Sequence, residues 1–367
     1  MKTSIRRGIV PGIAALAVVL SACSAGNNSD AGGSDSAGGD YEGTLSGGGA
    51  SSQEKAQNAW RAGFQTANSQ VTINYDPVGS GDGRANFISG AYAFAGTDSA
   101  LDDDEGELTG AQERCGGGNV IQVPAYVSPI AVVFNLPGIE ELSLAPDVIA
   151  DIFAGKITTW DDAAIAATND GVDLPDTTIS VVHRGDDSGT TENFTKYLQA
   201  AAPDAWTFEP DGVWPNELSG ASGEGTSGMI DLVTQGEGSI GYADASATGD
   251  LGVVAVGVGE EFNAPSAAGA AQVVANSPRT EGVPETDMAI DLARDTTEAG
   301  SYPVLLVSYL VACETYEDAA QAELVKGYLT YVLSEDGQKA AEGEAGSAPL
   351  DSELAAEAQG LVDAISG

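Results

Sequence analysis

The chain alternates between segments with the two-residue hydrophobic period of strands and segments with the three- to four-residue period of helices. Residues 71–75 alternate apolar and polar side chains, and residues 179–182 are rich in β-branched side chains, so both are predicted strands. A glycine-rich turn and then a helical pattern follow each of them, and a third such turn lies within residues 45–52. This alternation predicts an α/β fold.

Two longer apolar runs, residues 123–134 and 302–311, stand apart from this alternation. We expect them to be strands that cross between two lobes, because a chain of 367 residues exceeds what one core usually organises. The first lobe is then predicted to consist of residues 42–124 and 300–367. The second lobe is predicted to be inserted between them as residues 125–299.

The turn at residues 183–194 combines an arginine, acidic side chains and several hydroxyl groups. It joins a predicted strand to a predicted helix, so unpaired N–H groups and the positive end of the helix dipole face whatever fills the turn. Three turns of this kind, aimed at one point, would form an anion site. His183, the only histidine, is expected to point away from that site, because it alternates along the strand with Arg184.

The N-terminus has the pattern of a secretory signal. Basic residues precede an apolar run, residues 13–20, that is too short to span a bilayer. The tetrapeptide at 20–23 resembles the lipobox of bacterial lipoproteins, which would make Cys23 the lipidated first residue; a plain signal with an unmodified cysteine is the alternative. Residues 1–23 are therefore a predicted lipoprotein signal, and residues 24–41 a flexible tether to the outer face of the cell membrane.

Charge and cysteine content narrow the choice of partners and of compartment. The chain has 55 acidic and 14 basic side chains and a formal net charge of −41. Nucleic acid needs basic patches and is therefore not expected as a partner. Outside the signal, only Cys115 and Cys313 remain, and in an exported protein they are expected to form a disulfide; two independent buried thiols are the alternative.

Taken together, these motifs resemble the phosphate-binding lipoproteins of bacterial phosphate ABC importers. The matching segments are residues 46–52, 79–83, 95–98, 149–157, 160–162, 183–194 and 238–242. The resemblance implies a two-lobed type II periplasmic-binding-protein fold that closes on its ligand. It also implies an extracytoplasmic monomer that captures inorganic phosphate and delivers it to a membrane permease driven by an ATPase.

The resemblance assigns the binding site residue by residue. The phosphate-binding positions would be Ser51, Ser52, Ser80, Asp98, Arg184, Ser188, Gly189 and Thr190. Ser52 stands where the family usually has phenylalanine, and Asp186 matches a carboxylate that holds the arginine in place. Phosphate keeps at least one proton near neutral pH, so the Asp98 carboxylate would accept a hydrogen bond from it. Sulfate has no proton to donate and would be repelled by that carboxylate.

Two other classes of function compete with this interpretation. A secreted phosphatase-like enzyme would need a base, but the sequence has one histidine, no Gly-x-Ser-x-Gly elbow and no phosphate loop ending in Gly-Lys-Ser/Thr. We therefore expect no enzyme activity and no cofactor. Because histidine and cysteine ligands are nearly absent, we also expect no metal site; a magnesium site made of carboxylates alone is the alternative in so acidic a chain. A receptor for molybdate or sulfate is the other alternative, and Asp98 argues against it because those dianions carry no proton to donate.

Overall fold

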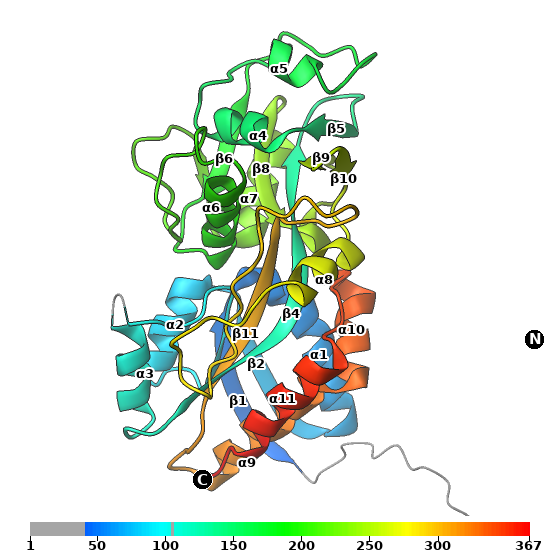
Figure 1. Ribbon diagram of the computed structural model, residues 1–367. Coiled ribbons are helices and arrows are strands. Elements are labelled where there is room, and N and C mark those ends of the chain that lie inside the picture. The colour runs from blue at the N-terminus through cyan, green and yellow to red at the C-terminus, as the bar shows by residue number, and fades with distance from the viewer. Residues whose placement is uncertain (1–40, 104–105) are drawn as a thin grey trace, which may run out of the picture. The chain divides into compact units, whose positions relative to one another are not determined.

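Two strands, β4 (Val120–Phe134) and β11 (Leu305–Cys313), run antiparallel side by side through the middle of the sheet (Figure 1). The structure is a computed structural model that describes residues 41–103 and 106–367, which belong to one compact unit. Every residue of both strands is buried, as their continuous apolar sequences require. Both were predicted from the sequence; β11 begins after Pro303, which has no backbone N–H to offer the ladder.

Residues 120–129 of β4 pair with β11, and β11 in turn pairs with a group of parallel strands near the N-terminus. That group consists of β1 (Glu42–Gly49), β2 (Gln70–Asp76) and β3 (Phe94–Thr97). The helices that belong to these strands are η1 (Ser51–Gln53), α1 (Glu54–Ala67), α2 (Ser80–Ile88), α3 (Glu107–Arg114), α9 (Ala319–Leu333), α10 (Glu335–Ala345) and α11 (Ser352–Asp363).

Residues 130–134 of β4 pair instead with a second group of strands. These are β5 (Glu141–Leu144), β6 (Ser180–Arg184), β7 (Ala221–Gly223), β8 (Ser239–Asp244), β9 (Gly252–Val258) and β10 (Glu261–Asn263). The accompanying helices are α4 (Pro146–Phe153), α5 (Ala163–Ala166), α6 (Gly189–Ala201), α7 (Gly225–Gln235) and η2 (Ala245–Ala247). Helix α8 (Ala267–Ala275) follows β10 in the chain and packs on β4. The predicted α/β class is confirmed, and β4 takes part in both groups of strands.

An aromatic cluster fixes α6 against the second group of strands. Phe194 of α6 stacks on Tyr242 of β8 with 4.4 Å between ring centroids, and Phe153 of α4 lies 4.8 Å from Phe194. Tyr197 and Leu198, which lie three and four residues after Phe194 and so on the same face of α6, are also fully buried. This packing holds the N-terminus of α6 in a fixed position relative to the end of β6.

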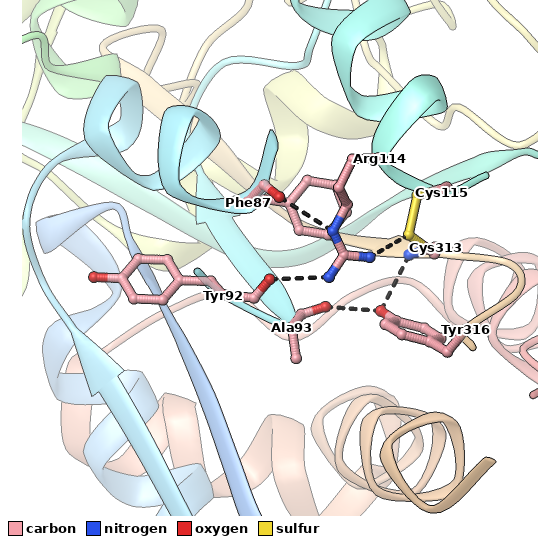
Figure 2. Close-up of a disulfide and its surroundings, with 7 residues drawn as sticks. All are labelled: Phe87, Tyr92, Ala93, Arg114, Cys115, Cys313 and Tyr316. Atoms are coloured by element: carbon pink, nitrogen blue, oxygen red, sulfur yellow. Dashed lines mark hydrogen bonds between the residues drawn. A yellow bond between two sulfur atoms is a disulfide. The ribbon is translucent and has the colours of Figure 1, made fainter. Parts of the chain in front are cut away.

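The predicted disulfide is confirmed: Cys115, directly after α3, is bonded to Cys313 at the end of β11 (Figure 2). The bond closes a loop with a sequence separation of 198 residues, which the chain-entropy model values at about 5 kcal/mol. Arg114 covers this region, with its guanidinium 4.6 Å from the Phe87 ring centroid and hydrogen bonds to the carbonyls of Phe87 and Tyr92. The end of β11 is therefore tied to α3 and to the turn after α2.

Three predictions remain untested by the fold. The lipoprotein signal with Cys23 and residues 24–40 of the tether lie outside the described residues. Tyr41, the last residue assigned to the tether, packs its ring 5.6 Å from that of Phe64. The lobe boundaries at 124 and 300 also stay predictions. Among the residues described, no helix is both long and apolar enough to span a bilayer.

Candidate functional site

Asp98, directly after β3, is the residue at which the predicted turns meet. Its buried carboxylate accepts hydrogen bonds from the hydroxyl groups of Ser52 at 2.7 Å and Thr190 at 3.1 Å. Its backbone N–H donates to the hydroxyl oxygen of Ser80 at 3.1 Å. Three segments that are far apart in the sequence therefore contact a single aspartate, so the three predicted turns do converge; that they bind an anion stays a prediction.

Burial raises the pKa of Asp98 above its usual value. The nearby hydroxyl groups of Ser308, Ser52 and Thr190, together with the positive charge of Arg184, act in the opposite direction and favour the ionised form. Asp98 is thus a desolvated acceptor that depends on its hydroxyl neighbours. Such a group discriminates strongly between ligands that bring a proton and ligands that do not.

The first turn follows β1 and carries Ser51 and Ser52, both buried. Gly49 makes the turn possible: it has a φ of +136°, and a Cβ there would lie 2.0 Å from the carbonyl oxygen of Gly96. Only glycine permits this close approach of the ends of β1 and β3. Ser52 then points to Asp98, whereas Ser51 points elsewhere, to a threonine described below.

The second turn begins α2 with Ser80, and the third turn begins α6 with Ser188, Gly189 and Thr190. These two helix starts touch: a Cβ on Gly189 would lie 2.6 Å from the Cβ of Asp98 and 2.7 Å from the hydroxyl oxygen of Ser80. Ser188 caps α6, because its hydroxyl accepts a hydrogen bond from the N–H of Thr191 at 3.2 Å. Its hydroxyl proton is still available to donate.

Arg184 ends β6 and is almost completely buried. Its Nε donates to Asp186 at 2.7 Å and its Nη2 pairs with the other oxygen of the same carboxylate, a bidentate arrangement. The expected pairing of the two residues is therefore present. The pair is close to neutral overall, so the arginine keeps a fixed orientation without leaving an uncompensated charge in the interior.

His183 lies outside this cluster, as the strand alternation predicted. Its ring stacks on Trp214 with a centroid distance of 5.2 Å, and its Nδ1 lies 2.8 Å from the carbonyl oxygen of Arg184. In the described part of the chain, no group of three or more His, Cys, Asp or Glu side chains is arranged to hold a metal ion. The site therefore consists of hydroxyl and N–H donors, one arginine and one buried acceptor.

A fourth turn was missed in the sequence. Thr226, near the start of α7, bonds Ser51 hydroxyl to hydroxyl at 3.0 Å, and its N–H donates to the same serine oxygen at 3.1 Å. The neighbouring Gly225 has a φ of +64° and donates its N–H to Asp186 at 3.0 Å. The signal was present, since residues 224–228 form another glycine-hydroxyl turn before a helix, but β7 has only three residues and no apolar pattern.

The comparisons with known proteins identify the family of the chain. Residues 32–336 match the family model of the PBP superfamily domain. The phosphate-binding protein PstS2 of Mycobacterium bovis (strain BCG / Pasteur 1173P2) is 32% identical over 371 residues, covering 96% of this chain and 97% of that relative. The relatives are binding proteins and not enzymes, as expected.

Solved structures show the same fold. A high-affinity periplasmic phosphate-binding protein (PfluDING) bound with phosphate at pH 8.5 superposes with a TM-score of 0.70 at 23% identity, over 86% of this chain and 93% of that one. A phosphate-binding protein from Stenotrophomonas maltophilia gives a TM-score of 0.67 at 20% identity, over 87% and 93% of the two chains. The predicted type II periplasmic-binding-protein fold is thereby confirmed. The chain belongs to the PBP superfamily and, within it, to the PstS family of phosphate-binding proteins.

Proposed function

We propose that this protein is the substrate-binding subunit of a phosphate ABC importer, which captures inorganic phosphate at Asp98 and delivers it to a membrane permease coupled to an ATPase. One observation carries the proposal: a single buried carboxylate receives hydroxyl donors from segments near residues 52 and 190 and lies against the turn at residue 80. Neutral phosphate solutions contain only protonated species, so the ligand supplies the proton that this acceptor needs.

The donors have distinct roles in this proposal. Ser51, Ser80 and Ser188 offer hydroxyl groups, and the N–H groups at the start of α2 and α6, including that of Gly189, add partial positive charge. The single hydroxyl protons of Ser52 and Thr190 are donated to Asp98, so these two residues would donate to the anion by turning from that carboxylate once it accepts the phosphate proton. Arg184 presents its guanidinium to the anion while Asp186 holds it in place. Because that pair is nearly neutral, it adds little net attraction, and hydrogen-bond dipoles carry much of the affinity, which suits a protein whose net charge of −41 repels anions.

Closure of two lobes around phosphate is the second part of the proposal. With lobe I taken as residues 42–124 and 300–367 and lobe II as residues 125–299, the hydrogen bond between Thr190 and Asp98 and that between Ser51 and Thr226 join the lobes. Opening would break these contacts and expose the donors to solvent. The mature protein is proposed to be an extracytoplasmic monomer, anchored to the outer face of the membrane by lipid on Cys23.

Replacement of Arg184 tests the assignment of the site. Truncating one partner of a buried charge pair costs about 2–5 kcal/mol, so Arg184→Ala is expected to weaken phosphate binding by at least about 30-fold. Equilibrium dialysis with radiolabelled phosphate gives the dissociation constants. The matched control is Arg279→Ala, which breaks a surface pair with Glu357 and should bind as the wild type does.

Asp98→Asn tests the acceptor in the same assay. The amide can donate as well as accept, so this variant is expected to lose selectivity and to bind sulfate more tightly than the wild type does. Unchanged phosphate affinity in Arg184→Ala together with unchanged selectivity in Asp98→Asn would show that the anion binds elsewhere. Turnover of a phosphomonoester by the wild type would instead support an enzyme.

A further inference from the structure

Arg294 is a buried cation that the binding site described so far does not use. It lies between α8 and β11, with 7% of its surface exposed. Its Nη1 donates to the carbonyl oxygen of Leu305 at 2.9 Å, and its Nη2 donates to the side-chain oxygen of Asn193. Among the described residues it forms no ion pair with a carboxylate.

Burying an arginine without a paired carboxylate raises the free energy of the folded state, so we expect an anion to compensate its charge. Burial lowers the pKa of Arg294 to about 10, against the opposing influence of Glu192, Tyr309 and Asp291. The guanidinium therefore stays protonated at neutral pH. Glu192 is itself occupied, since it pairs with Lys196 at 2.5 Å and accepts a hydrogen bond from Ser99.

Asn193 connects Arg294 to the anion site. Its amide Nδ2 donates to the carbonyl oxygens of Asp98 and Gly189, both at 2.8 Å. Since Arg294 has donors only, it fixes which end of the Asn193 amide faces it, and hence which end faces Asp98. A cavity of about 440 Å³ lies beside the site, and Asp98, Asn193 and Arg294 all line it.

The charges of the site leave a role for a second cation. Arg184 and Asp186 cancel, and Asp98 adds one negative charge where the anion is proposed to bind. We propose that Arg294 is a positioning residue of the anion site, which holds Asn193 against Asp98 and Gly189 and supplies the positive charge that offsets Asp98 when phosphate is bound. The inference rests on the proposed function, because it concerns the same site.

The test compares Arg294→Gln, Arg294→Lys and the control Arg279→Gln, whose arginine lies on the same segment but pairs with Glu357 at the surface. Phosphate dissociation constants come from titration calorimetry, and unfolding temperatures are measured without phosphate. Arg294→Gln is expected to lose at least about 10-fold in affinity, as for removal of a charged hydrogen-bond donor. Arg294→Lys keeps the charge and is expected to lose less than about 3-fold in phosphate affinity. Arg279→Gln is expected to bind phosphate as the wild type does.

A purely structural role predicts a different result: Arg294→Gln would unfold at a lower temperature, while affinity would stay within about twofold of the wild type. That result, or an equal loss in Arg294→Lys and Arg294→Gln, overturns the proposal. If Arg294→Gln does not fold, Asn193→Ala takes its place, and wild-type affinity in that variant overturns the proposal as well. Failure of the wild type itself to bind phosphate would instead refute the proposed function.

Discussion

At the scale of single residues, buried carboxylates carry both the proposed selectivity and the expected pH response. Besides Asp98, Asp244 at the end of β8 is fully buried and accepts hydrogen bonds from the Tyr126 hydroxyl at 3.1 Å and from the N–H of Ser246 at 2.9 Å. Burial raises the pKa of Asp244 to about 6, although those hydrogen bonds favour its ionised form. It titrates within the range in which the protein can be studied.

Asp244 is therefore expected to make the folded state less stable as the pH rises. Below pH 4 the carboxyl is protonated in both the folded and the unfolded chain. Between about pH 4 and pH 6 the unfolded chain ionises first, so about 1–3 kcal/mol of unfolding free energy is lost and does not return above pH 6. Urea denaturation at a series of pH values, with Asp244→Asn as the reference, measures this difference; a difference that stays constant from pH 4 to pH 7 contradicts it.

The convergence of the candidate site residues was predictable from the sequence where a motif carries them. Asp98, Ser52, Ser80 and Thr190 do come together around one point. Asn193 and Arg294 were not predicted, because neither belongs to a recognisable sequence motif. Asn193 is a polar residue one helical turn past the cap of α6, and Arg294 lies in an irregular segment. Their roles depend on which distant backbone carbonyls they meet, and this is decided only when the chain folds.

At the scale of elements, the N-terminus of α6 combines helix capping with the proposed binding site. Ser188→Ala removes the cap, which is expected to cost about 1 kcal/mol of stability, and also removes a hydroxyl donor from the site. Ser266→Ala is the matched control, because Ser266 caps α8 in the same way through the N–H of Gly269 at 3.1 Å. Thermal unfolding and phosphate titration should show both variants destabilised but only Ser188→Ala weakened in binding. Wild-type affinity in Ser188→Ala would remove Ser188 from the site.

Elements with a clear hydrophobic period were predicted well from the sequence, and short elements were not. The strands β2, β4, β6 and β11 match the predicted ranges within a few residues, and the helices α1, α2 and α6 follow the three predicted turns. In contrast, β7 has three residues without apolar character, and only its pairing with β6 makes it a strand. Tertiary pairing thus created the fourth turn, with Thr226, at a position where local sequence preference is weak.

At the scale of the whole molecule, the net charge of −41 opposes compaction. Added salt shortens the screening length from about 10 Å at 0.1 M to about 3 Å at 1 M, so the unfolding temperature is expected to rise with sodium chloride. The same series at pH 4.5, where many carboxylates are protonated, should give a smaller rise. An unfolding temperature that falls or stays level with salt at pH 7 would show that self-repulsion is not a significant cost in this fold.

The proposed selection of phosphate depends on all three scales: a buried acceptor, helix starts that supply donors, and strands that bring them together. Isothermal titration calorimetry of the phosphate-stripped protein at pH 7, first with phosphate and then with sulfate, measures that selection directly. We predict saturable binding of one phosphate per chain and no measurable binding of sulfate. Absence of heat with phosphate, or equal affinity for sulfate, would contradict a site built on Asp98 as a proton acceptor.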